Sequence, residues 1–206
     1  MKLLKILALV FLISSLNQCI TYLNKDFPAY NPAKIDKKIG NIDFVLYYNH
    51  YNAAGERSLI SEAVHKANKQ AFNDIIGGCK CINKFNIYVD GLDDISKLNS
   101  KNLVNIEVTS KVKPTSSLIL SSTLFVITAG LFPVFGEING KTEFVAFNQG
   151  KEIKRYTYEN DVIEVRQILL LFVMPFRNRS YITNQNVPDN FVNDIYRDKL
   201  YSSDSN

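Results

Sequence analysis

The chain has 206 residues, 46% of them hydrophobic and 21% charged, and its formal net charge is +4. This composition is ordinary for a folded protein, and the length suits one domain with a sizeable core. The positive charge is too small to indicate a nucleic-acid-binding protein, because the chain has no Lys/Arg cluster that would add to it.

The first 19 residues have the layout of a secretory signal peptide. Lys2 and Lys5 provide a basic start, and a short apolar run over residues 6–16 follows. That run is too short to span a bilayer, which takes roughly 20 apolar residues. We therefore expect residues 1–18 to be a signal peptide for export.

The end of this segment resembles the lipobox of bacterial lipoproteins. Leu16 stands three residues before Cys19, and Gln18 stands where the family prefers Ala, Gly or Ser, as looser lipoboxes allow. The resemblance implies that Cys19 becomes residue 1 of the mature chain and carries acyl groups, palmitate among them, which hold the protein on a lipid bilayer. It also implies a bacterial cell envelope location, in the outer membrane facing the periplasm, because Ile20 does not signal inner-membrane retention. A plain signal peptide with Cys19 as an ordinary thiol, or an uncleaved anchor, are the alternatives.

The composition after the signal peptide predicts a tether followed by one domain. The lipidated cysteine and the tether occupy residues 19–40, which contain Pro28, Pro32 and several polar residues. A single domain then covers residues 41–201, and the polar residues 202–206 form a loose tail.

Alternation of apolar and polar residues predicts the strands. The last two strands flank a Gly-containing loop and form a hairpin. Residues 104–112 have one polar face, which is typical of an antiparallel sheet with one wet side. The predicted strands cover residues 42–48, 84–89, 104–112, 142–147 and 152–158.

Helical spacing of apolar residues predicts three helices. The clearest covers residues 58–76, with Ser58 as its N-cap and the glycines at positions 77–78 as its end. A second covers residues 161–173 after a capping-box pattern, and a buried strand is the alternative for its apolar part, residues 169–173. A third opens at Pro188. The order of these elements predicts an α+β domain with a mainly antiparallel sheet packed with helices.

Residues 114–136 contain no charged residue. Our first expectation is a buried strand or strand–turn, and the second is re-entrant or surface-lying contact with lipid. The third is a transmembrane span over residues 118–136, which would leave two half-sheets with open edges on opposite sides of the membrane. The candidate residues for a partner interaction or membrane contact are Leu124, Phe125, Leu131, Phe132 and Pro133.

The C-terminal half resembles a loosely defined group of small bacterial lipoproteins without assigned activity. The residues that carry this likeness are Thr128, Gly130, Leu131, Pro133, Tyr156, Tyr158 and the apolar segment 169–175. The resemblance implies a small α+β module like those of envelope-assembly lipoproteins, and it indicates location more than activity.

Two further cysteines, Cys79 and Cys81, are separated by one residue. An oxidising compartment favours a disulfide between them, although so small a ring is strained and easily reduced. Free buried thiols and a metal or redox role are the alternatives. A metal site takes about four ligands, and nothing in the sequence places His50 and His65 beside this pair. We predict no metal and no cofactor.

The sequence contains neither a Gly-x-Ser-x-Gly elbow nor a zinc-protease motif. Asp90, Asp93 and Asp94 are the only dense carboxylates, and a turn followed by a capped short helix accounts for them. We therefore predict a non-enzymatic, membrane-anchored envelope lipoprotein. It would act as an adaptor, assembly or interaction module, with the lipid bilayer and an envelope protein as partners. The alternatives are a bitopic membrane protein and an exported hydrolase, which would need a histidine base or two carboxylates about 5–10 Å apart.

Overall fold

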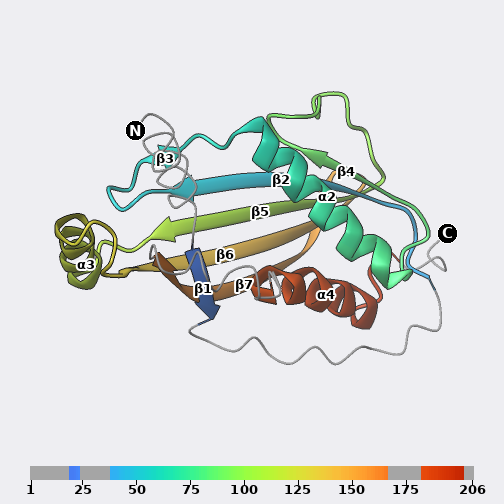
Figure 1. Cartoon of the computed structure of the whole chain (residues 1–206). Coiled ribbons are helices and arrows are strands. Elements are labelled where there is room, and N and C mark those ends of the chain that lie inside the picture. Colours follow the sequence, from blue (N-terminus) through green and yellow to red (C-terminus); the bar gives the residue numbers. More distant parts are fainter. Residues whose placement is uncertain (1–18, 24–37, 167–181, 202–206) are drawn as a thin grey trace, which may run out of the picture.

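The computed structural model describes residues 19–23, 38–166 and 182–201, which form one seven-stranded sheet and three helices (Figure 1). The strand order is β1-β7-β6-β5-β2-β3, and β4 pairs with β2 beside this path. The strands are β1 (Cys19–Leu23), β2 (Ile42–Tyr51), β3 (Arg57–Ser58), β4 (Phe85–Val89), β5 (Asn102–Val112), β6 (Val134–Asn148) and β7 (Lys151–Arg166). The helices are α2 (Glu62–Cys79), α3 (Ser116–Ile127) and α4 (Ile182–Arg197).

Most strand pairs in this sheet are antiparallel. The pairs β1–β7, β7–β6, β6–β5 and β2–β3 run antiparallel, whereas β5–β2 and β2–β4 run parallel. Helix α2 lies between β2 and β4 in the chain, as expected because parallel neighbours need a long crossover. The predicted α+β class with a mainly antiparallel sheet is confirmed. The predicted hairpin is also present as β6 and β7, with longer strands than expected.

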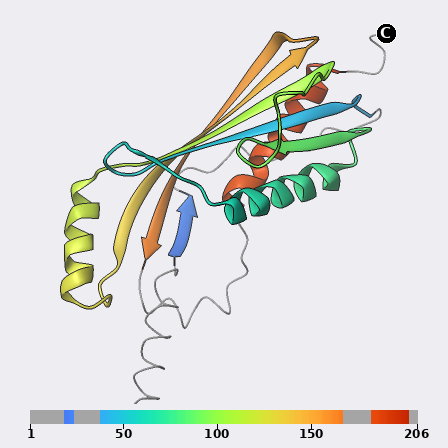
Figure 2. The same cartoon turned by 90° about the horizontal axis from the view of Figure 1, so that it is seen from above.

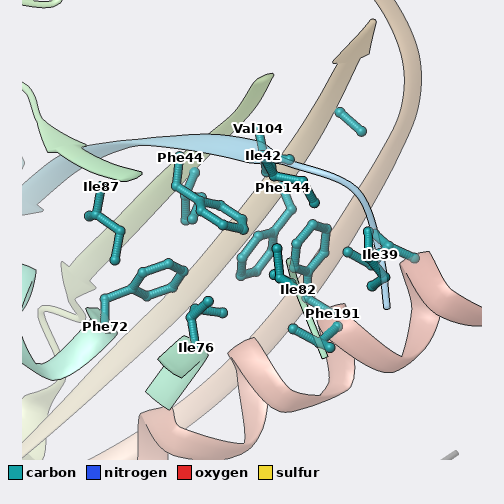
Figure 3. Close-up of a cluster of buried hydrophobic side chains, with 14 of the residues drawn as sticks. Ile39, Ile42, Phe44, Phe72, Ile76, Ile82, Ile87, Val104, Phe144 and Phe191 are labelled. Carbon is teal, nitrogen blue, oxygen red and sulfur yellow. The ribbon is translucent and has the colours of Figure 1, made fainter. Parts of the chain in front are cut away.

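One hydrophobic core lies between the sheet and helices α2 and α4, which cover the same face of the sheet (Figures 1 and 2). Phe44 of β2 and Phe144 of β6 reach into this core from the sheet (Figure 3). Phe191 of α4 stacks on Phe144 with 4.1 Å between ring centroids. Phe72 of α2 meets Phe44 edge-on at 5.7 Å. An aromatic pair therefore holds each of the helices α2 and α4 to the sheet.

On the face of the sheet away from α2 and α4, the side chains of the central strands are largely polar. Glu107 of β5, Glu143 of β6 and Arg155 of β7 occupy this second face, where Arg155 lies 3.7 Å from the Glu143 carboxylate. Such alternation is the pattern of an antiparallel sheet with one face toward water. The wet face predicted for residues 104–112 agrees with this arrangement.

Helix α2 is displaced by several residues from its predicted position. It begins at Glu62 rather than at residue 58, because Ser58 belongs to the short strand β3. It continues through the glycines at positions 77–78 and ends at Cys79. Lys80, with φ of 51°, takes the left-handed conformation that we expected of a glycine. Sheet pairing and core packing therefore outweigh the local start and stop signals.

The helix predicted over residues 161–173 is wrong for residues 161–166, which continue strand β7. Val162, Ile163 and Val165 are β-branched and suit a strand. Strand β6 on one side and β1 on the other supply their backbone partners. Long-range pairing thus outweighs the capping-box pattern. The remainder of that predicted helix and the apolar segment 169–175 lie outside the described residues.

Helix α4 begins six residues before Pro188, so the proline lies inside the helix rather than at its first turn. A proline there removes one helical hydrogen bond. The helix persists because Phe191, Val192 and Ile195 are buried in the core on the next turns.

The structure differs from the predicted tether at both of its ends. Residues 19–23 form strand β1 against β7, in keeping with the strand propensity of their β-branched and aromatic members. Ile39 is only 3% exposed, and its backbone N–H donates to the carbonyl of Cys81 at 2.8 Å. The predicted signal peptide 1–18, the middle of the tether and the tail 202–206 lie outside the described residues.

Candidate functional site

The uncharged run forms a protruding structure at one end of the sheet, which we call the apolar tip (residues 114–136). Helix α3 lies at the end of the long β5–β6 pair, away from α2 and α4 (Figures 1 and 2). The Thr115 side chain caps α3 by accepting a hydrogen bond from the Leu118 N–H at 3.2 Å. After the helix, Gly130 takes φ of 88° and donates its N–H to the Phe125 carbonyl at 2.7 Å. The chain then returns into β6.

Our first expectation for this run, a buried strand or strand–turn, is wrong. Residues Ser116–Ile127 form a helix, and much of its surface is exposed. The residue types alone left both outcomes open, since a short apolar run is ambiguous between strand and helix. The Thr115 cap and the turn at Gly130 favour the helix.

Seven large apolar side chains of the apolar tip are 38–77% exposed, and they are Ile119, Leu120, Val126, Ile127, Leu131, Phe132 and Phe135. Burying one such side chain fully contributes about 1.5–3 kcal/mol. A large cluster of exposed apolar side chains marks a contact site for a protein or a membrane, and these seven come from one short segment. The apolar tip is therefore the candidate functional site.

The sequence identified this region but not all of its exposed residues. Of the predicted contact residues, Leu131 and Phe132 are exposed, whereas Leu124, Phe125 and Pro133 are half-buried. The exposed side chains of α3 were missed, because a helix that is apolar on all sides carries no periodic signal to separate its inner and outer faces.

Hydroxyl groups stabilise the apolar tip from within. Ser121 is 4% exposed; its Oγ donates to the Leu118 carbonyl at 3.2 Å and accepts from the Phe135 N–H at 3.1 Å. Thr128 Oγ1 donates to the Leu124 carbonyl at 2.7 Å and accepts from the Phe132 N–H at 2.9 Å. These bonds join α3 to the turn and to the start of β6, so the helix is held in one orientation on the sheet.

Charged residues appear at the base of the apolar tip. Lys113 and Glu137 flank the uncharged run, and the Lys113 ammonium lies 3.7 Å from the carboxylates of both Glu137 and Asp161. The Lys113 N–H also donates to the Glu137 carbonyl at 2.8 Å. This charged group marks a sharp boundary between the apolar tip and the polar body of the sheet.

The pairing of β5 with β6 argues against a transmembrane span over residues 118–136. The two strands flank that run and pair continuously from Asn102–Asn148 to Val112–Ile138. A span would place them on opposite sides of a membrane. Within residues 19–23, 38–166 and 182–201, no helix is both long and apolar enough to cross a membrane.

The register of the sheet brings Cys19 to the same end as the apolar tip. Cys19 of β1 pairs with Arg166 of β7, and Arg166 pairs on its other side with Val134 of β6. The three residues therefore form one row across three strands. Val134 directly follows the exposed turn of the apolar tip, so the two features predicted separately from the sequence are neighbours in the fold.

Cys79 and Cys81 are joined by a disulfide in the structure. Cys81 is buried in the core, and Cys79 is half-buried at the end of α2. The Cys81 N–H also donates to the Cys79 sulfur at 3.1 Å. The pair thus belongs to the packing of α2 against the sheet.

The clustered carboxylates of Asp93 and Asp94 accept hydrogen bonds within turns and form ion pairs. Asp93 accepts hydrogen bonds at 2.8 Å from the Lys69 ammonium and from the Val89 N–H. Burial opposes ionisation of Asp93, but these two bonds outweigh it and lower the pKa of its carboxyl group. Asp94 accepts from the Ser96 N–H at 3.1 Å. Residues 90–97 form turns rather than the predicted short helix.

Among the described residues, no hydrogen bond joins either histidine to these carboxylates, although His65 lies beside the turn at Gly91. His50 Nδ1 lies 2.6 Å from Ser110 Oγ, which is the arrangement closest to a nucleophile and its base. No carboxylate of the described residues orients the other ring nitrogen, as the third member of such a site does. His65 of α2 packs beside Tyr48 with 6.0 Å between ring centroids. In the described part of the chain, no group of three or more His, Cys, Asp or Glu residues could hold a metal ion.

No protein-family model and no curated protein matches the chain. One similar solved structure is a neuraminyllactose-binding hemagglutinin homolog from Helicobacter pylori. It is 8% identical, with a TM-score of 0.37 over 82% of this chain and 98% of that chain. Another is a PelC dodecamer from Paraburkholderia phytofirmans, 11% identical, with a TM-score of 0.25 over 87% of this chain and 96% of that chain. Likenesses at this level carry no argument about the function of this chain.

Proposed function

We propose that this chain is a lipoprotein of a bacterial cell envelope, attached through acyl groups on Cys19 and exposed to the periplasm from the outer membrane. Its α+β domain acts as a non-enzymatic interaction module, as an adaptor or assembly factor does. The observation that carries the proposal is the basic and apolar N-terminal segment that ends at a cysteine in a lipobox-like context.

The position of Cys19 at the first residue of β1 supports this proposal. Once residues 1–18 are removed, the acylated residue is itself the first residue of a strand that pairs with β7. The acyl chains would therefore enter the bilayer beside the folded domain. Several acyl chains together hold a soluble domain on a membrane, whereas one gives only reversible binding.

The bonding of the polar side chains supports a non-enzymatic role. Asp93 and Asp94 are engaged in turns, and the pair formed by His50 and Ser110 has no orienting carboxylate among the described residues. The apolar tip instead carries most of the large apolar side chains that are exposed in the described structure, which is typical of a contact surface. An interaction module accounts for that surface.

The mass of the N-terminal fragment of the natively expressed protein tests this proposal. We expect a fragment that begins at Cys19 and carries acyl groups, and we expect Cys19→Ala to abolish both cleavage and acylation. The double variant Cys79→Ala/Cys81→Ala is the matched control and should keep the acyl groups. An unmodified fragment beginning at or after residue 19 would instead identify a secreted protein, and an intact Met1 would identify an uncleaved anchor.

A further inference from the structure

We propose that the apolar tip inserts into the surface of the same bilayer that receives the acyl chains of Cys19. The domain is then held on the membrane at two adjacent points, one covalent and one formed by α3 and its turn. This inference rests on the proposed acylation of Cys19, and it names a lipid surface as the partner of the candidate site.

The distance between the two points follows from the sheet register. Cys19, Arg166 and Val134 lie in one row across β1, β7 and β6. Adjacent strands are about 4.8 Å apart, so the Cα of Cys19 lies roughly 10 Å from the Cα of Val134. Leu131 and Phe132, both exposed, precede Val134 by two or three residues. A bilayer that accepts the acyl chains therefore meets this turn as well.

The dimensions of the apolar tip suit the membrane surface rather than its centre. Helix α3 has 12 residues, which gives a length of about 18 Å. The hydrocarbon core of a bilayer is about 30 Å thick. A short helix of this kind reaches only the boundary between headgroups and acyl chains, about 5–10 Å deep. The ion pairs of Lys113 with Glu137 and Asp161 would then lie at headgroup level.

Several hydroxyl groups within the apolar tip are satisfied by the tip itself, as hydrocarbon requires. Ser121 and Thr128 each bond to backbone groups of the tip. Thr123 Oγ1 donates to the Ile119 carbonyl at 2.9 Å. These hydroxyl groups need no partner from outside, and the outward surface of α3 presents Val126 and Ile127. A lipid partner demands no directional contacts, and this surface offers few.

A fluorescent label read against lipid-borne quenchers tests the insertion. The natively acylated full chain is reconstituted into vesicles of phosphatidylethanolamine and phosphatidylglycerol after labelling at Ile127→Cys with an environment-sensitive dye. The introduced thiol reacts selectively, because Cys79 and Cys81 are paired and Cys19 carries acyl groups under the proposed function. Ile127 is 74% exposed, so the substitution leaves the core intact.

The matched control is the same label at Ile153→Cys. Ile153 is also an exposed apolar residue, but it lies near the opposite end of β7 from Arg166. At about 3.4 Å per residue along the strand, Ile153 and Arg166 are roughly 40 Å apart. This site should stay in water while the apolar tip is in lipid.

We expect the label at position 127 to lose most of its fluorescence when lipids carry a nitroxide near the headgroup end of the acyl chain. The label at position 153 should keep its fluorescence. Adding Val126→Asp to the Ile127→Cys protein should abolish the loss. Equal fluorescence at both positions would overturn the inference. So would a label at position 127 that is shielded from aqueous iodide but unaffected by nitroxide lipids, which would assign the tip to a partner protein or a second copy.

The mass of the same samples separates the two proposals. Acyl groups on Cys19 without quenching at position 127 would overturn the tip insertion alone. Quenching at position 127 in a protein that lacks acyl groups, with peptide mapping finding no dye on Cys19, would overturn the lipoprotein assignment and keep the tip insertion.

Discussion

Tyr158 of β7 donates a hydrogen bond to Asp194 of α4, with 2.5 Å between the phenol and carboxylate oxygens. Two residues earlier on the same strand, Tyr156 donates to Asp198 at 2.6 Å, one turn further along the helix. Burial and these bonds raise the pKa of both phenols. The two tyrosines that carried a family likeness in the sequence thus fasten α4 to the sheet.

Replacing Tyr158 with Phe should lower the free energy of unfolding. A hydrogen bond to a charged group contributes about 1.5–3 kcal/mol, and Tyr158→Phe removes it while keeping the ring. Urea unfolding measures the change. Tyr88→Phe is the control, since that hydroxyl has no hydrogen bond in the described structure, and it should change stability by less than about 0.5 kcal/mol. Equal losses in both variants would contradict the role of the Asp194 bond.

Asp198 makes the fold sensitive to acid. The hydrogen bond from Tyr156 and the ammonium of Lys154 lower the pKa of its carboxyl group. A lowered folded-state pKa gives stability that is complete above the unfolded value, about 3.9, and is lost as the pH falls through the folded value. We expect the free energy of unfolding to fall below about pH 4, with a shallower decrease in Asp198→Asn. Urea unfolding over a pH series measures both slopes, and identical slopes would contradict the assignment.

Phe191 should be among the most costly core residues to truncate. It is fully buried, stacks on Phe144 at 4.1 Å and meets Tyr156 edge-on at 5.6 Å. Phe191→Ala should lower the free energy of unfolding by about 3–5 kcal/mol, through lost burial and the cavity left behind. Val64→Ala on the exposed side of α2 is the control and should have little effect. A small loss at Phe191 would mean that α4 is not needed for the core.

Gly140 and Asn160 should show coupled effects on stability. They pair across β6 and β7, and a Cβ added at Gly140 would overlap the Asn160 side chain. Gly140→Ala alone should therefore destabilise the protein by about 0.5–1.5 kcal/mol, because the Asn160 side chain has to leave its rotamer. Asn160→Ala removes the obstruction, so the double variant should recover part of the loss. Thermal unfolding of the three variants measures the coupling, and strictly additive effects would contradict it.

The disulfide between Cys79 and Cys81 should be detectable but contribute little to stability. It closes a loop with a single intervening residue, so it removes only a small amount of conformational entropy from the unfolded chain. Peptide mapping without reductant should recover both cysteines in one peptide that lacks two thiol hydrogens. Reduction should shift the melting temperature only slightly. Two free thiols in protein isolated from an oxidising compartment would contradict the bond.

Several elements followed from the sequence because their signals are local. Alternation in residues 84–89 and 104–112 predicted β4 and β5, since one side of each strand is more buried than the other. The apolar run over residues 42–48 predicted β2, in which three consecutive residues are buried. The absence of charge over residues 114–136 likewise indicated the candidate site before its shape was known. Its exact exposed face did not follow, because α3 is apolar on all sides.

The sequence by itself determined the α+β class, the apolar run and the lipobox-like cysteine, because composition and short-range period carry that information. Tertiary structure decided that residues 161–166 are strand, because β1 and β6 compete successfully with the local helix signal. It also decided that Cys19 and the apolar tip are neighbours. Arg166 pairs with Cys19 on one side and Val134 on the other, and only the register of a sheet can join residues more than a hundred positions apart.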